Sequence, residues 1–201
     1  MGNGRNILHK IISRAYPLIP VYEVVDLDYI KRCSGILADR VSSEYRPDCV
    51  VGIANGGLYP ALEVSHRLGC EMDSMQISHY RNRIPVLNDV PGAVKVLRDF
   101  ISINPKAVLN RDTRTKNFEG KKVLLVDDEV GCGDTLELAK QVLRAKKPHA
   151  MRTATIFRQA PYKPDFFVVE NFRSCIIKPW RKSSPYYEAY LEKMTNLGLV
   201  S

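Results

Sequence analysis

The stretch from Val123 to Thr135 constrains the fold of this chain more than any other, because it joins an apolar run to a pair of acids. Its sequence is Val-Leu-Leu-Val-Asp-Asp-Glu-Val-Gly-Cys-Gly-Asp-Thr. Four apolar residues rich in Val and Leu are typical of a strand buried on both faces of a parallel sheet. Asp127 and Asp128 follow at the carboxyl end of this strand, where the ligands of open α/β sheets bind. The stretch therefore predicts a buried strand that brings two carboxylates to a binding site.

A glycine-containing loop follows the two acids and leads into a predicted helix. Glycines allow the backbone to approach a ligand closely, and the free N–H groups at a helix start bind anions. A single acid would be equally consistent with a buried strand that ends in a solvated turn. Two acids, a Gly-x-Gly loop and a helix start in succession favour a site for a sugar phosphate. From Thr135 onward, one helical face carries apolar residues, namely Leu136, Ala139 and Leu143 with Val142 beside them.

This motif resembles the phosphoribosyl-diphosphate (PRPP) motif of the type I phosphoribosyltransferases. The resemblance implies that Asp127 and Asp128 contact the ribose hydroxyls and help to organise Mg²⁺, mostly through water and ligand. Many members that act on 6-oxopurines have an Asp at the position of Gly131. Gly131 has no side chain that could accept or donate a proton. The adenine and orotate branches also lack that Asp. The loop implied to bind the 5-phosphate consists of Gly131, Cys132, Gly133, Asp134 and Thr135.

A second loop, Asn55-Gly56-Gly57, follows the apolar strand predicted for residues 48–54. A Gly-Gly turn between strand and helix exposes N–H groups to an anion, although many such turns bind nothing. Its place in the chain, upstream of the acidic motif, matches the pyrophosphate loop of the family. Purine members often carry Arg or Lys where this chain has Asn55, so weaker contact with pyrophosphate is expected here.

The segment 162–166 followed by Ile177-Lys178-Pro179-Trp180 resembles the hood that closes over the base in hypoxanthine and xanthine–guanine enzymes. The resemblance implies that Trp180 stacks on the base and that main-chain groups near Ile177 hydrogen-bond its edge. A core or interface role is the alternative for this Trp. The Lys that contacts the 6-oxo group in purine enzymes falls on Arg158 or Gln159. Arg158 could donate to an oxo group, and Gln159 could both donate and accept.

The polar stretch from 78 to 120 corresponds to the mobile loop that closes over the reacting groups in this family. Ser78-His79-Tyr80 resembles the Ser-Tyr pair of the purine branch. Apolar spacing at Val94 to Ile101 predicts a short helix inside the loop, so a lid and an oligomer contact are both open. For His79, a structural role is favoured over that of a catalytic base.

Helix and strand patterns alternate along the chain, which predicts a parallel sheet with helices on both faces. We expect one α/β domain over 1–201 with the type I phosphoribosyltransferase fold: a mainly parallel twisted sheet flanked by helices, with a small hood. Residues 1–46 would form N-terminal helices, and 158–201 the hood and a C-terminal helix. The expected elements are helices at 6–15, 26–43 and 58–68, and strands at 48–54, 72–78, 151–157, 166–169 and 173–178.

The composition of the chain bears on its expected cellular compartment and on the class of its ligands. The chain has 201 residues, 45% of them hydrophobic, and its five cysteines show no Cys-x-x-Cys spacing, which argues against zinc and fits a reducing cytoplasm. No apolar run is long enough for a membrane span, and the N-terminus is too polar for a signal peptide. The net charge of +8 favours steering of an anionic substrate over specific nucleic-acid binding.

These patterns predict an enzyme that binds PRPP with Mg²⁺ and transfers the phosphoribosyl group to a purine, with 6-oxopurines favoured, releasing pyrophosphate and nucleotide in salvage. A homo-oligomer, most simply a dimer, is expected. The alternative is a non-catalytic PRPP- or nucleotide-binding regulatory protein of the same fold, because the site could bind its ligand without turnover.

Overall fold

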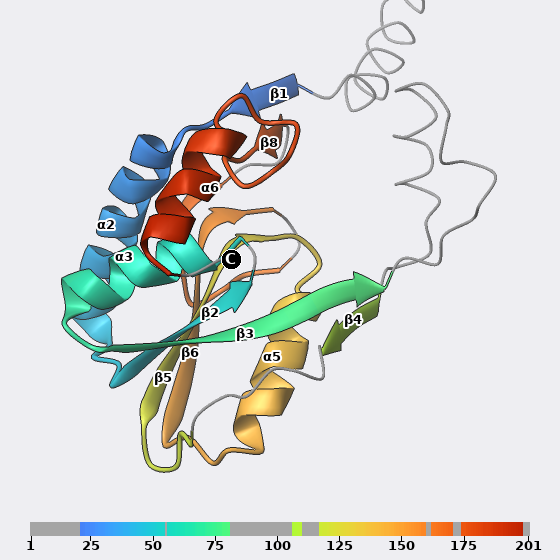
Figure 1. Ribbon diagram of the computed structural model, residues 1–201. Helices are drawn as coiled ribbons and strands as arrows, with labels where there is room; N and C mark the ends of the chain where they lie inside the picture. Colours follow the sequence, from blue (N-terminus) through green and yellow to red (C-terminus); the bar gives the residue numbers. More distant parts are fainter. Residues whose placement is uncertain are drawn as a thin grey trace, which may run out of the picture.

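The computed structural model describes residues 21–54, 56–80, 106–109, 117–159, 162–170 and 174–198. Within these ranges the main sheet has the strand order β4-β3-β2-β5-β6-β7 (Figure 1). All neighbouring strands run parallel except β3 and β4, which pair antiparallel at one edge. The strands are β2 Cys49–Ala54, β3 Glu71–Tyr80, β4 Lys106–Leu109, β5 Lys122–Val130, β6 Ala150–Arg158 and β7 Phe166–Glu170. The predicted α/β sheet is confirmed.

Helices cover both faces of this sheet. Helices α2 (Leu27–Glu44) and α3 (Leu58–Leu68) pack on one face, and α5 (Asp134–Arg144) packs on the other (Figure 1). The predicted cap of α2 is confirmed, since Asp26 Oδ1 accepts a hydrogen bond from the Tyr29 N–H at 2.7 Å. The apolar face predicted for α5 is also buried, with Leu136, Ala139 and Leu143 fully enclosed.

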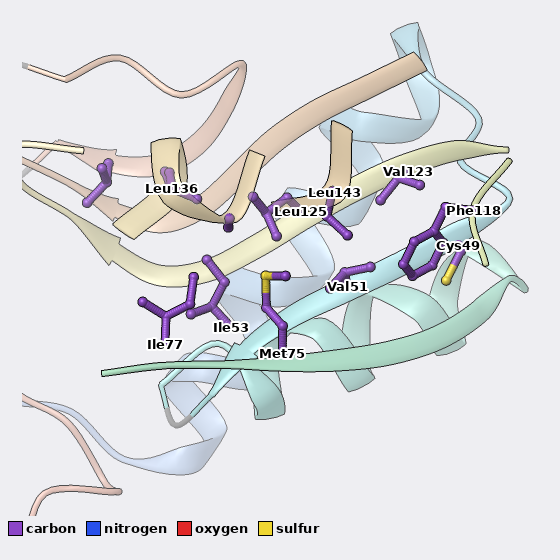
Figure 2. Close-up of a cluster of buried hydrophobic side chains, with 12 residues drawn as sticks. Cys49, Val51, Ile53, Met75, Ile77, Phe118, Val123, Leu125, Leu136 and Leu143 are labelled. Atoms are coloured by element: carbon purple, nitrogen blue, oxygen red, sulfur yellow. The ribbon is translucent and has the colours of Figure 1, made fainter. Parts of the chain in front are cut away.

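Apolar side chains alternate between the two faces of the sheet along its central strands, so helices must cover both faces. In β2, Cys49, Val51 and Ile53 point toward α5, whereas Val50 points toward α2 and α3. Figure 2 shows the α5 side of this core, where Leu136 and Leu143 face Leu125 of β5 and Met75 of β3 lies beyond Ile53. A strand buried on both faces must be apolar throughout, which is why the sequence of β2 and β5 is so distinctive.

The hood is a separate small layer above the carboxyl end of the sheet. Strand β1 (Val21–Val24) pairs in parallel with β8 (Ser174–Ile177), and α6 (Tyr187–Asn196) lies beside them (Figure 1). Tyr190 and Met194 of α6 are buried against Ile30 and Phe157, so the hood shares a core with α2 and β6. The sequence predicted β8 and a C-terminal helix here, but β1 was not expected.

Two boundaries differ from the prediction. Residues 78–80 were assigned to the long loop but are the last residues of β3, because β4 supplies an antiparallel backbone partner. Arg158 was assigned to the hood region but ends β6, and β7 is an edge of the main sheet. The helices expected at 6–15 and near 94–101 lie outside the described residues.

In the part of the chain that is described, no helix is both long and apolar enough to cross a membrane.

Candidate active site

A cleft of about 460 Å³ opens at the carboxyl ends of β2 and β5, beneath the hood. The sheet side contributes acids from β5, and the hood side contributes Lys178, Trp180 and Arg181. Open parallel sheets bind ligands at this edge. The full lining is Ile53, Ala54, Gly56, Ile77, Asp127, Asp128, Glu129, Thr135, Lys178, Trp180 and Arg181.

Asp127 and Asp128 form the floor of the cleft, as predicted for adjacent acids on this strand. Their exposures are only 8% and 9%, and Asp127 Oδ1 accepts a hydrogen bond from the Asp128 N–H at 2.8 Å. Strand β5 continues past both acids to Val130 because it still pairs with β6 there. The two carboxylates are therefore held by regular strand geometry and not by a flexible turn.

The two acids differ in their electrostatic setting. Burial and the neighbouring charge of Asp128 raise the pKa of Asp127 well above the usual aspartate value. Burial would raise the pKa of Asp128 as well, but the Lys178 ammonium outweighs burial and holds that pKa below the usual value. Asp128 is thus the stably ionised member of the pair, and a further cation would favour ionisation of Asp127.

Lys178 and Glu129 were not among the predicted site residues, although both lie in the quoted motifs. Lys178 Nζ lies 2.5 Å from Asp128 Oδ2 and also forms an ion pair with Glu129, and the lysine side chain is only 3% exposed. Burial would lower the pKa of Lys178, but the two carboxylates outweigh it and raise that pKa. A signal was available: three consecutive acids at a buried strand end need a positive partner nearby.

The Gly-Gly loop approaches the acids so closely that it tolerates no side chain. A Cβ at Gly56 would lie 2.3 Å from Asp128 Oδ1, and one at Gly57 would lie 2.5 Å from the carbonyl oxygen of Val126. The predicted pyrophosphate loop and the predicted ribose-binding acids therefore meet in one site. Asn55, the third residue predicted for this loop, lies outside the described residues.

The predicted phosphate loop, residues 131–135, leads directly into α5. Gly133 has a left-handed φ of 93°, and a Cβ there would lie 2.0 Å from the Tyr162 ring. Tyr162 donates from its hydroxyl to Glu137 Oε1 at 2.8 Å, which fixes the ring over the loop. The first N–H groups of α5 lie at the loop, and Thr135 lines the cleft, whereas Cys132 and Asp134 are exposed. The loop has the features of an anion site.

The residues predicted to bind the base fall into two groups. Trp180 lines the cleft, with its ring 5.8 Å from that of Tyr190 at an angle of 59°. Gln159 lies beside the cleft and donates from Nε2 to Glu129 Oε1 at 2.5 Å. Arg158 instead turns toward β7, where it forms an ion pair with Glu170.

Two further predictions concern main-chain groups and the lid. The Ile177 carbonyl oxygen accepts a hydrogen bond from the Val25 N–H at 3.1 Å, so this group serves the hood itself. Ser78, His79 and Tyr80 lie on β3, opposite Val108, Ala107 and Lys106 of β4.

The donor set can also be compared with the needs of Mg²⁺. Within the described ranges no three His, Cys, Asp or Glu side chains form a cluster that could hold a metal ion by themselves. Mg²⁺, however, usually keeps several waters and takes one or two carboxylates together with substrate phosphates. Asp127 and Asp128 fit that pattern, because they offer hard carboxylate oxygens beside a loop that has the features of an anion site.

Comparison with known proteins agrees with this geometry. The family model described as a phosphoribosyl transferase domain matches residues 26–182. A xanthine-guanine phosphoribosyltransferase of Cereibacter sphaeroides is 31% identical over 175 residues, which cover 83% of this chain and 90% of that protein.

Solved structures show the same fold. A purine phosphoribosyltransferase from Pyrococcus horikoshii superposes with a TM-score of 0.62 at 23% identity, over 80% of this chain and 95% of that one. A Neisseria gonorrhoeae protein with bound ppGpp superposes with a TM-score of 0.63 at 18% identity, over 90% and 98%. Because the family model covers most of the chain and the fold agrees, the chain is a member of the phosphoribosyltransferase family of pentosyltransferases.

Proposed function

We propose that this protein transfers the 5-phosphoribosyl group of PRPP to a purine base, with 6-oxopurines favoured, and releases pyrophosphate in nucleotide salvage. The observation that carries the proposal is the cleft itself. Two buried acids lie between a glycine loop at a helix start and a Trp on the hood. The xanthine-guanine phosphoribosyltransferase from Cereibacter sphaeroides supports a purine as the acceptor.

Each side of the cleft suits one part of such a substrate pair. The N–H groups at the start of α5 and Thr135 would bind the 5-phosphate, and Asp127 and Asp128 would accept hydrogen bonds from the ribose hydroxyls. Gly56 and Gly57 would let pyrophosphate approach the backbone. Trp180 would offer a flat face to the base.

In the reaction, the bond from C1′ of ribose to the pyrophosphate oxygen breaks and a bond from C1′ to a purine nitrogen forms. The proton carried by the base ring is released to solvent. The protein contributes alignment of the two substrates and charges placed for an oxocarbenium-like transition state. The carboxylates beside the sugar favour the positive charge that develops there, while the α5 N–H groups hold the phosphate end still.

Mg²⁺ would be held by Asp127 and Asp128, mostly through water and the oxygens of the substrate. When bound, it would neutralise the charge of the diphosphate. Burial and Asp128 raise the pKa of Asp127, and the cation would counteract this shift by favouring the ionised carboxylate.

The decisive experiment is to incubate the protein with PRPP, Mg²⁺ and, in turn, hypoxanthine, guanine, xanthine, adenine, uracil and orotate. We expect nucleotide from at least one 6-oxopurine. The Asp127→Asn variant should lose at least about a hundredfold in rate, because alignment of the ribose is lost. Asp39→Asn is the matched control, since Asp39 is exposed and pairs with Arg67 far from the cleft.

PRPP binding without nucleotide from any of the six bases would contradict the proposal and support the regulatory alternative, which the named relatives do not favour. A cytoplasmic location and a homodimeric state stay predictions from the sequence. Gel filtration with light scattering measures the latter.

A further inference from the structure

A chain of three polar side chains joins the acidic floor of the cleft to the hood and to the end of β6. Lys178 follows β8, Glu129 lies on β5, and Gln159 follows β6. Lys178 is ion-paired with Glu129, and Gln159 Nε2 donates to Glu129 Oε1 at 2.5 Å. The side-chain exposures of Lys178 and Glu129 are 3% and 18%, so the contacts are largely shielded from water.

The chemistry of the three groups fixes the direction of each hydrogen bond. An ammonium only donates, and an ionised carboxylate only accepts. Gln159 must therefore turn its NH₂ group toward Glu129 and its carbonyl oxygen away. Lys178 reinforces this orientation, because its ion pair with Glu129 holds the carboxylate in place.

The carbonyl oxygen of Gln159 lies beside the open space at Gly131. A Cβ built on Gly131 would have this Oε1 as its nearest neighbour, at 3.9 Å. The Gln159 N–H also donates to the Val130 carbonyl oxygen at 2.7 Å, which ties the residue to the start of the phosphate loop. An oriented acceptor thus borders the space where Gly131 offers no side chain of its own.

We propose that Gln159 Oε1 accepts a hydrogen bond from a ring N–H of the bound base, and that Glu129 and Lys178 are positioning residues that hold the amide in this orientation. The inference rests on the proposed function, because it assigns a base-recognising group beside that cleft, next to Glu129 of its lining. For a 6-oxopurine the matching donor is N7–H. The tautomer with its proton on N7 leaves the lone pair of N9 free to attack C1′, so this acceptor selects the reactive form.

If Gln159 had a purely structural role, its side chain would contact Glu129 but not the base. The affinity for a base would then not depend on an N–H at position 7. The two roles therefore differ in one measurable property, the preference for hypoxanthine over 7-deazahypoxanthine, which has C–H in place of the N7 group.

The test measures binding of these two bases without requiring turnover. The chain has one Trp, Trp180, which lines the cleft, so quenching of its fluorescence reports binding, with calorimetry as a second method. Titrations use the full chain alone and with Mg²⁺ and a non-reacting carbocyclic PRPP analogue. We expect hypoxanthine to bind about three- to tenfold more tightly than the deaza base, the range of one hydrogen bond.

Variants assign the preference to the residues. Gln159→Leu should bind both bases equally, while Gln141→Leu, on the exposed face of α5, should keep the preference. Glu129→Gln should reduce the preference because the amide of Gln159 can then rotate. Glu71→Gln, an exposed partner of Lys121, is its control.

Equal binding of the two bases by the unmodified protein would overturn the inference, and this result does not depend on any variant folding. A preference that survives in folded Gln159→Leu would also overturn it. In either case nucleotide formation from PRPP would still support the proposed function. Binding of neither base, with the PRPP analogue bound, would overturn the inference, and the base assay above would then decide the proposed function separately.

Discussion

The two ends of the cleft are built in different ways. The end proposed to bind phosphate (the phosphate end) is made of backbone: Gly56 and Gly57 pack against the acidic strand β5, and Gly133 precedes α5. The end proposed to bind the base (the base end) is made of charged and aromatic side chains, with Lys178 buried between two carboxylates and Trp180 in the lining of the same cleft. Closely packed backbone is destabilised by added atoms, because there is no space for them. A buried ion pair is destabilised by the loss of one partner, because the other charge is then left unpaired.

The difference between the two ends indicates which of them determines the choice of base. A phosphate end made of N–H groups and glycines suits any ligand with the same sugar phosphate, so it carries little information about the base. The base end depends on contacts between residues far apart in the chain, and Lys178 lies 49 positions from Glu129. We therefore expect substitutions at the base end to change the choice of base more than substitutions at the phosphate end do.

The largest effect is expected at the base end, from Lys178→Met. This change leaves the buried carboxylates of Asp128 and Glu129 without their cation, which costs about 3–5 kcal/mol in the free energy of unfolding. Urea denaturation measures the change. Lys121→Met should stay close to the unmodified protein, because its pair with Glu71 is exposed. A similar loss in both variants would show that the burial of Lys178 carries no special weight.

A smaller effect is expected at the phosphate end, from Gly57→Ala. The new methyl group would lie 2.5 Å from the Val126 carbonyl oxygen and 2.8 Å from that of Ile53, and backbone cannot move aside easily. Overpacking of this kind costs about 1–3 kcal/mol. The matched change Gly35→Ala, within α2, meets only the Arg67 side chain at 3.6 Å and should stabilise the helix by about 0.5–1 kcal/mol. Equal stability of the two variants in urea would contradict the backbone description of this end.

The same contrast explains which parts could be predicted from the sequence. Strands β2 and β5, the Asp26 cap and the apolar face of α5 depend on neighbours in the chain, so their patterns are visible locally. Strands β1 and β4 are four residues each, and they exist because β8 and β3 offer partners. No local pattern of residues announces such a partner.

The residues of the cleft differ in the same way in how well the sequence predicts them. The glycines of the phosphate end and the two adjacent acids were predicted from one contiguous motif and one Gly-Gly turn. At the base end, the sequence left Arg158 and Gln159 as alternatives for the contact with the base, and Arg158 pairs with Glu170. The sequence did not indicate Lys178, which is the buried partner of Asp128. Side-chain pairing across the sheet decides these outcomes, and sequence order does not encode it directly.

At the base end, Trp180→Leu should raise the KM for the base about tenfold, because loss of an aromatic face removes up to about 1.5 kcal/mol of stacking. Trp180→Phe keeps a flat ring and should stay within about threefold of the unmodified enzyme. The KM for PRPP should change little in either variant, since the phosphate end is untouched. Equal effects on both KM values would indicate that Trp180 supports the hood as a whole, through its contact with Tyr190.

The smallest effect is expected where a side chain supports the backbone of the phosphate end. Glu137 pairs with Lys140 and accepts from the Tyr162 hydroxyl, and these contacts hold the pKa of Glu137 below its usual value. A lowered pKa in the folded state means stability that is present above the unfolded-state pKa and lost as the pH falls through the folded value. Glu137→Gln should therefore be less stable than the unmodified protein at pH 7, by less than about 1 kcal/mol because the carboxylate is partly exposed. The difference should shrink at an acid pH below the usual glutamate pKa of about 4.3. Thermal unfolding at both pH values measures it, and a difference that persists in acid would assign the contribution of Glu137 to packing under Tyr162 and not to its charge.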